Sequence, residues 1–251
     1  MENNRSGFEN ENELFKALNG KYFTELNDNL KAFISFIIGN NIPKNQISVT
    51  MVGGTEKCDL KINIDNTEYS ISIKKGGGNS VHQEPVNTFV EYLKENYSIS
   101  NDLADDILFF VWGDGTLDGT GKKENRLSAS EIATMHPGKI NSIKDFFKTH
   151  KRELIQRFLL KGVFGNEIYC IYHGDSGHGL WASSEEVLEL LCDKNFESSS
   201  AAVPVGGLTF QAWNRAIGNT EDSTEGKRGV VQLKWGKLEK HLEVIKSRRS
   251  S

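Results

Sequence analysis

Carboxylate, hydroxyl and ammonium side chains gather on one short stretch of the sequence, residues 56–84. Asp59 stands just before an alternating run of apolar and polar residues, and Ser72 and Lys74 close a second run of the same kind. A carboxylate binds hard divalent cations through oxygen, and a nearby ammonium can be placed beside an attacking water. These residue types suit a site that holds a divalent cation and activates water.

The two alternating runs predict a β-hairpin. Their apolar positions are Leu60, Ile62 and Ile64 in the first run, and Tyr69, Ile71 and Ile73 in the second. A period of two is typical of half-buried strands, and the turn residues Asp65, Asn66 and Thr67 lie between the runs. Only registers that differ by an even number of residues keep the apolar side chains of both strands on one face and the polar ones on the other. Asp59 is therefore expected opposite either Lys74 or Ser72. In both registers these polar residues share the face that points away from the core.

This hairpin resembles the PD-(D/E)XK nuclease superfamily, in which an Asp on one strand is followed by an acid, any residue and a Lys. The positions here read Asp59 and then Ser72-Ile73-Lys74, with Ser72 in the place of the acid and Cys58 in the place of the Pro. Some restriction-enzyme branches have a similar Ser-x-Lys. The resemblance implies that Asp59 and the Ile73 carbonyl bind Mg²⁺, that Lys74 orients or deprotonates water, and that Ser72 occupies the second-ligand position.

The carboxylate ligand that Ser72 cannot supply must then come from another residue, unless Asp59, the Ile73 carbonyl and water are enough to hold the metal. A Gly-rich loop follows Lys74, and Val86, Phe89, Val90 and Leu93 predict a helix with Pro85 in its first turn. Glu84 is therefore expected at this helix N-terminus as the replacement ligand. Glu13 and Glu25, on two predicted N-terminal helices, are the alternatives. Contacts with DNA are assigned to Lys75, Asn79 and Gln83.

The remaining pattern predicts a mixed α/β fold: a mixed sheet flanked by helices, similar to that of restriction endonucleases. Helices are expected at 11–18, 23–38, 128–134, 140–160 and 185–191, and strands at 46–52, 106–112 and 167–173. We expect one nuclease domain over residues 1–251, with residues 1–20 partly disordered. The loop with His173, Asp175 and His178 and the loop with Asp114 and Asp118 match no hydrolase or calcium motif and are interpreted as loops.

The C-terminal segment, residues 201–251, is basic within an acidic chain. It carries nine Lys and Arg against five Asp and Glu, whereas the whole chain has a net charge of −4. Arg, Gln and Lys read base edges and phosphates, and aromatic residues at Phe210, Trp213 and Trp235 can anchor the strands beneath them. DNA contacts are therefore expected at Gln211, Arg215, Arg228, Gln232 and Lys234.

Composition narrows the class of protein further. Three cysteines without CxxC spacing indicate neither a disulfide framework nor a zinc site, and the sequence shows neither a secretory signal nor a membrane span, so a cytoplasmic location is expected. The resemblance implies a Mg²⁺-dependent, site-specific endonuclease for double-stranded DNA, of type II and homodimeric on a palindromic site. The alternatives are a defence effector nuclease without site preference and an inactive DNA-binding protein with a nuclease fold.

Overall fold

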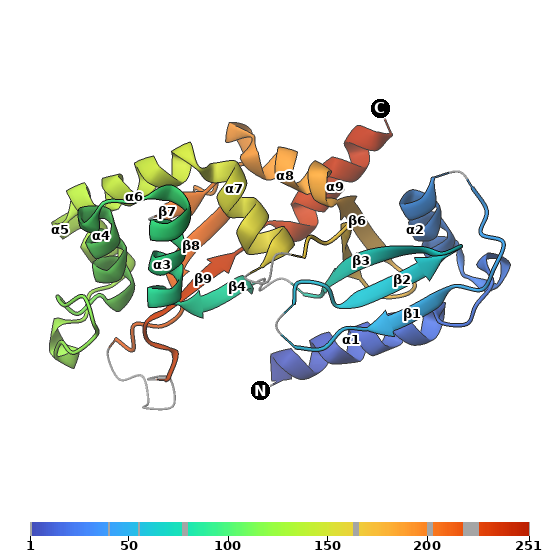
Figure 1. The fold of residues 1–251 in the computed structure, drawn as a ribbon, viewed down its shortest axis with the longest axis horizontal. Coiled ribbons are helices and arrows are strands. Elements are labelled where there is room, and N and C mark those ends of the chain that lie inside the picture. Colours follow the sequence, from blue (N-terminus) through green and yellow to red (C-terminus); the bar gives the residue numbers. More distant parts are fainter. Residues whose placement is uncertain are drawn as a thin grey trace. The chain divides into compact units, whose positions relative to one another are not determined.

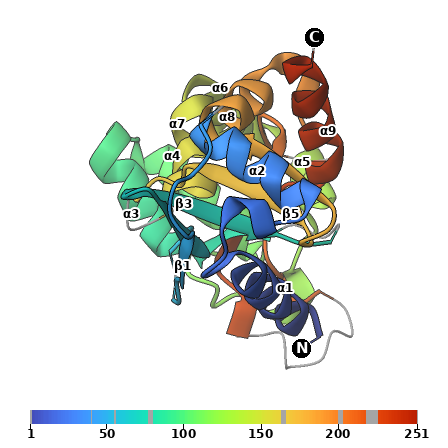
Figure 2. The same cartoon turned by 90° about the vertical axis from the view of Figure 1, so that its right-hand side faces the viewer.

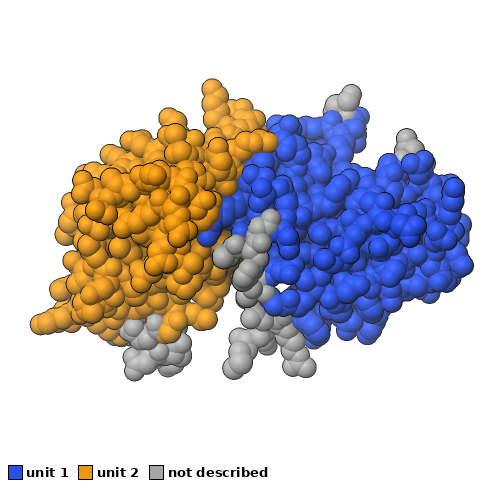
Figure 3. All heavy atoms as spheres, viewed as in Figure 1, with its two compact units in different colours: residues 1–79, 156–190, 237–251 blue, residues 80–155, 191–236 orange. Residues whose placement is uncertain are grey.

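The computed structural model describes residues 2–39, 41–54, 56–76, 80–162, 166–199, 203–217 and 226–250, without the side chains of residues 2–7. The chain forms two compact units (Figure 3). Unit 1 comprises residues 1–79, 156–190 and 237–251, and unit 2 comprises residues 80–155 and 191–236. That both units together form one nuclease domain stays a prediction.

Unit 1 is built on a five-stranded mixed sheet in the order β1-β2-β3-β5-β6 (Figure 1). The strands are β1 (Ser48–Met51), β2 (Leu60–Ile64), β3 (Thr67–Lys74), β5 (Cys170–Gly174) and β6 (Gly179–Ser183). The pair β3 and β5 is parallel, and the other neighbours in this sheet are antiparallel. Parallel pairing requires a long crossover, and in this chain unit 2 provides most of the residues between β3 and β5.

The predicted hairpin is β2 and β3. Asp65 and Asn66 have φ values of 46° and 69°, as a two-residue turn between twisted strands requires. Leu60 pairs with Ile71, which selects the register that places Asp59 opposite Ser72. The other register considered from the sequence, with Asp59 opposite Lys74, is wrong.

Six helical segments in the described part of unit 1 accompany this sheet. They are α1 (Glu2–Leu18), η1 (Phe23–Glu25), α2 (Asp28–Ile38), the π-helical segment η3 (Gln156–Lys161), α8 (Ser184–Cys192) and α9 (Leu238–Arg249). Leu14 and Leu18 of α1 and Phe33 of α2 belong to the buried cluster that also contains Ile62. Figure 2, in which this unit faces the viewer, shows α1 and α2 beside the strands. The helix expected at 23–38 is broken because Asn27 caps α2 by accepting a hydrogen bond from the Leu30 amide.

Unit 2 is built on an antiparallel sheet in the order β4-β9-β8-β7. The strands are β4 (Ser80–Pro85), β9 (Val230–Lys234), β8 (Leu208–Ala212) and β7 (Val203–Val205). The helical elements are α3 (Val86–Tyr97), α4 (Asn101–Trp112), η2 (Lys123–Asn125), α5 (Ala129–Met135), α6 (Pro137–Thr149), α7 (Lys151–Ile155) and η4 (Lys194–Phe196). The Phe210 ring lies 4.9 Å from Phe147, 5.6 Å from Phe89 and 5.9 Å from Phe110, so aromatic packing joins β8 to three helices.

Three expectations about helices and strands that follow the hairpin are wrong. Residues 106–112 form the second half of helix α4, because Ser100 caps the Leu103 amide and the buried residues recur at helical spacing. Gln83 and Glu84 lie in strand β4 rather than in the first turn of α3. The helix expected at 140–160 is interrupted at His150, which closes α6 before α7 and the π-helical segment begin.

Candidate active site

Asp59 and Ser72 face each other across the β2–β3 hairpin. The Asp59 carboxylate accepts a hydrogen bond from the Ser72 hydroxyl at 3.1 Å and another from the Ile73 amide at 2.5 Å, both through Oδ2. Ser72 is buried, whereas the side chain of Asp59 is 23% exposed. Among the described residues no partner reaches Oδ1 of Asp59, so this oxygen remains available to a ligand.

Lys74 completes a chain of polar contacts with these two residues. Its ammonium donates to Ser72 Oγ at 2.7 Å and to the Ile73 carbonyl at 3.0 Å, and it lies 3.6 Å from Asp59 Oδ2. An ammonium has three N–H donors. Two are used within the strand, and no further hydrogen bond of this ammonium occurs in the described part of the chain. One N–H is thus left for a water molecule or a phosphate oxygen.

His173 fixes the backbone beneath Lys74. The two residues are register partners in the parallel pair β3–β5, and His173 Nδ1 lies 3.1 Å from the Lys74 carbonyl. Because a carbonyl only accepts, Nδ1 carries the proton. Burial lowers the pKa of His173, although Glu239 and the hydrogen bond to Lys74 act in the opposite direction. The imidazole is therefore neutral at pH 7.

Helix α1 brings a second carboxylate, Glu11, toward the hairpin. Glu11 lies three residues before Leu14 and seven before Leu18, so it extends the buried stripe of the helix toward its N-terminus. Burial raises the pKa of Glu11, the negative charge of Asp59 raises it further, and Lys74 lowers it. Within the described part of the chain, Glu11 has neither a hydrogen bond nor an ion pair. The helix thus holds a partly desolvated carboxylate within electrostatic reach of Asp59.

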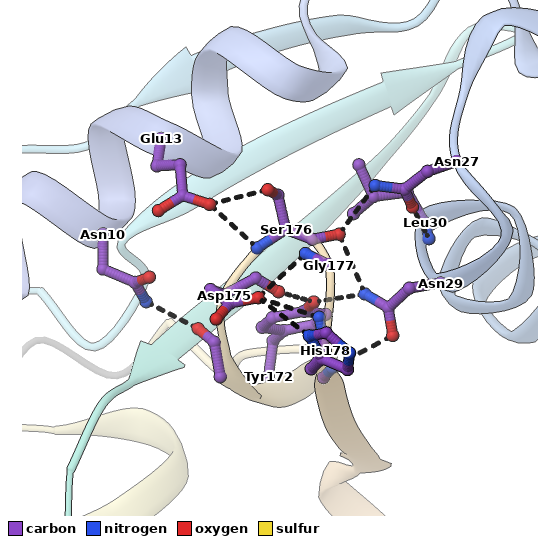
Figure 4. A network of polar contacts seen from close by, with 12 residues as sticks. Asn10, Glu13, Asn27, Asn29, Leu30, Tyr172, Asp175, Ser176, Gly177 and His178 are labelled. Carbon is purple, nitrogen blue, oxygen red and sulfur yellow. Dashed lines mark hydrogen bonds and ion pairs between the residues drawn. The ribbon is translucent and has the colours of Figure 1, made fainter.

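The β5–β6 loop anchors α1 on either side of Glu11 (Figure 4). Asn10 donates to the Gly174 carbonyl at 2.8 Å, and Glu13 accepts from the Ser176 hydroxyl at 2.6 Å and from its amide at 3.1 Å. Asn29 of α2 holds the other side of the loop through the Ser176 carbonyl and the Gly179 amide. Because these contacts flank position 11 in the chain, they fix the register of α1 on the sheet.

Asp59 and Glu11 together suit a magnesium ion. Both offer carboxylate oxygen, and Mg²⁺ in proteins is commonly held by one or two carboxylates while it keeps several waters. A divalent cation would also offset the repulsion with which Asp59 raises the pKa of Glu11. No group of three or more His, Cys, Asp or Glu residues able to hold a metal occurs in the described ranges.

The acids expected from the sequence at this site have other partners. Glu13 binds Ser176, and Glu25 accepts from the Tyr22 amide at 2.6 Å in a helix cap. Glu84 belongs to unit 2, where it is buried in β4 and lies 2.8 Å from Nε2 of His82. That Glu84 ligates the metal stays a prediction. Sequence reasoning missed Glu11, although its spacing from Leu14 and Leu18 was a usable signal.

Two of the residues expected to contact DNA, Arg215 and Arg228, are partly buried and bind other groups of unit 2. Arg215 donates to the Phe110 carbonyl and stacks over that ring at 4.7 Å, and burial lowers its pKa to about 10. Arg228 lies 2.8 Å from Asp114, whose side chain is fully buried. Burial works against ionisation of Asp114, but the hydrogen bonds from Arg228 and Thr116 outweigh it and lower the pKa. Both arginines therefore have clear structural roles.

The other expected contacts differ in exposure. Lys75, Gln83 and Lys234 are exposed, Gln211 is half-buried and Gln232 is buried. Asn79 lies outside the described residues. DNA contact by each of these residues stays a prediction.

Comparison of the sequence with protein-family models and with curated proteins gave no match. Among solved structures, the fold is similar to restriction endonuclease MspI, determined in complex with its cognate DNA. The TM-score is 0.51 at 11% sequence identity, and the alignment covers 82% of this chain and 76% of that chain. At this identity the likeness concerns the fold alone. The chain has a mixed α/β fold similar to that of a restriction endonuclease.

Proposed function

We propose that this protein is a Mg²⁺-dependent endonuclease that hydrolyses phosphodiester bonds in double-stranded DNA, of the type II restriction kind and of the Ser-x-Lys variant. The observation that carries the proposal is the contact chain from Asp59 through Ser72 to Lys74 on two neighbouring strands. The similarity of the fold to a restriction endonuclease supports it.

Each residue of the site has a distinct task in this proposal. Asp59 and Glu11 would hold Mg²⁺, with the Ile73 carbonyl as a further oxygen donor. When bound, the ion would supply Lewis-acid chemistry for the scissile phosphate and for a water molecule. Lys74 uses its remaining N–H to orient the attacking water and to stabilise the charge that develops on the phosphate. The Ser72 hydroxyl orients Asp59 because it donates to the carboxylate while it accepts from Lys74.

The substrate and assembly follow from the same proposal. MspI was determined with its cognate DNA, which supports a duplex as the substrate here. A type II enzyme that cuts a palindromic site presents two symmetric halves, so we propose a homodimer that acts in the cytoplasm. In the described part of the chain, no helix has the length and apolar character needed to cross a membrane.

Two alternatives remain as proposals. Ser72 stands at the position of an acid, which favours a DNA-binding protein that has lost catalysis. An effector nuclease without site preference would keep the Asp59–Lys74 site but lack base recognition.

Digestion of supercoiled plasmid by the purified protein separates these functions. We expect discrete fragments in Mg²⁺ and none in excess chelator. A smear in Mg²⁺ would favour the effector nuclease. Intact plasmid at every Mg²⁺ concentration, together with retained duplex binding, would favour the inactive DNA-binding protein and overturn the proposed enzyme.

A further inference from the structure

Three glutamines form a continuous row across the sheet of unit 2. Gln83 of β4 pairs with Gln232 of β9, and Gln232 pairs with Gln211 of β8. Residues directly opposite each other on neighbouring strands place their side chains on the same face of a sheet. We call Gln83, Gln232, Gln211 and the adjoining Ser80 the amide row.

Hydrogen bonds orient the side chains of the amide row. Gln211 Nε2 donates to Gln232 Oε1 at 2.8 Å, and Gln232 Nε2 donates to Ser80 Oγ at 3.1 Å. Gln83 Nε2 donates to the same Ser80 hydroxyl at 2.9 Å. The Ser80 hydroxyl therefore fixes the orientation of the Gln83 and Gln232 amides, and Gln232 in turn fixes that of Gln211.

The sheet has a second, apolar face that is filled by the core of unit 2. Phe210, Val231 and Leu233 alternate with the glutamines along β8 and β9 and are buried. The amide row thus lies on the face that carries exposed Gln83 and Lys234. The amide row therefore does not contribute to the packing of the core of unit 2.

The outer amides keep hydrogen-bonding capacity for a ligand. Each primary amide has two N–H donors and a carbonyl with two lone pairs. The contacts within the row use one N–H each of Gln83 and Gln211. Among the described residues, no partner engages the carbonyl or the second N–H of either side chain.

We propose that the amide row reads base edges in the major groove of duplex DNA, with Gln83 and Gln211 as the contacting residues and Ser80 as a positioning residue. A donor beside an acceptor matches adenine, which offers N6–H next to N7, and a G·C pair, which offers cytosine N4–H next to guanine O6. Because Arg215 is engaged by the Phe110 carbonyl and Arg228 by Asp114, we assign this recognition to the oriented amides rather than to these two guanidinium groups. The inference rests on DNA as the substrate of the proposed function.

Selection from a random duplex pool, with Asp59→Asn protein in calcium, first defines the preferred sequence. Competition binding between that duplex and a scrambled one then gives the discrimination of each variant, which is the ratio of its affinities for the two duplexes. Every variant also carries Asp59→Asn and is measured in calcium. Gln83→Ala and Gln211→Ala should each lower discrimination by about 10- to 100-fold, as expected for loss of a bidentate base contact. Asn96→Ala is the control, since Asn96 is an exposed amide on α3 of the same unit, and it should leave discrimination unchanged.

The Ser80 variants test positioning. Ser80→Ala should lower discrimination while affinity for the scrambled duplex is kept, and Ser80→Thr, which retains a hydroxyl, should restore it. Thermal unfolding midpoints near that of the parent protein confirm that the variants are folded. Unchanged discrimination in both Gln83→Ala and Gln211→Ala would overturn the amide row as the reader, even if the wild-type protein cuts DNA. Cleavage of plasmid without any selected sequence would also overturn it and leave the nuclease proposal intact.

Discussion

At the scale of single residues, the proposed site has a hydroxyl at position 72, where the resemblance implies a carboxylate, and takes a second carboxylate from helix α1. A carboxylate at position 72 would only accept hydrogen bonds, whereas Ser72 donates to Asp59 and accepts from Lys74. Ser72 therefore links the two charged groups without adding negative charge beside Asp59. Glu11 supplies the second carboxylate in our proposal.

Glu11 and Glu13 provide a matched pair of variants for this claim. Glu11→Gln should raise the Mg²⁺ concentration for half-maximal cleavage by about 10-fold or more, because a ligand is lost. Glu13→Gln keeps an oxygen that accepts from Ser176, so its Mg²⁺ requirement should stay close to that of the wild type. Equal shifts in the two variants, measured by cleavage rates over a Mg²⁺ titration, would count against Glu11 as a ligand.

The raised pKa of Glu11 gives the same variant a second readout. In the folded protein, burial and Asp59 disfavour its charged form, so ionisation of Glu11 costs stability as the pH rises above the ordinary Glu pKa. Without metal at pH 7, Glu11→Gln should therefore unfold at the same temperature as the wild type or a higher one. Added Mg²⁺ should raise the midpoint of the wild type more than that of the variant. A variant that is destabilised without metal would contradict this assignment.

At the scale of elements, sequence periodicity identified the hairpin but misassigned the run at residues 106–112. Apolar and polar residues alternate in both runs of the hairpin, and the residues between the runs tolerate positive φ. The strand pattern and the turn residues therefore both predict a hairpin. The run at 106–112 is too short and too uniformly apolar to distinguish a strand from a buried helix. Its helical state depends on the cap at Ser100, which precedes the run.

Residue type alone also does not predict the structural partners of the arginines. Arg228 lies in a basic segment, and only the fold shows that it pairs with buried Asp114. We predict that Arg228→Ala lowers the free energy of unfolding by about 3–5 kcal/mol, because it leaves a buried carboxylate unpaired. Lys227→Ala removes an exposed neighbouring cation that lies over Trp213 and should cost less than about 1 kcal/mol. Equal unfolding midpoints in urea for the two variants would contradict a structural role for Arg228.

At the scale of the whole molecule, the sequence predicted the fold class but could not show which distant segments meet. The similarity to a restriction endonuclease confirms the mixed α/β fold. Glu11 and Asp59 are separated by more than forty residues, and their proximity depends on the packing of α1 against the sheet and on its anchoring by the β5–β6 loop. The amide row likewise depends on the pairing of strands β4, β9 and β8, which are distant in the chain.

The most direct test of the proposed nuclease site compares cleavage with binding in two variants. Asp59→Asn and Lys74→Ala should each lower the single-turnover rate of plasmid cleavage in Mg²⁺ by at least about 100-fold, because both act on the scissile phosphate. Duplex affinity, measured without metal, should remain close to that of the wild type. Lys61→Ala is the control, since Lys61 is a more exposed lysine on β2 that pairs with Glu68, and it should cut normally. Cleavage at the wild-type rate by either Asp59→Asn or Lys74→Ala would contradict the proposed site.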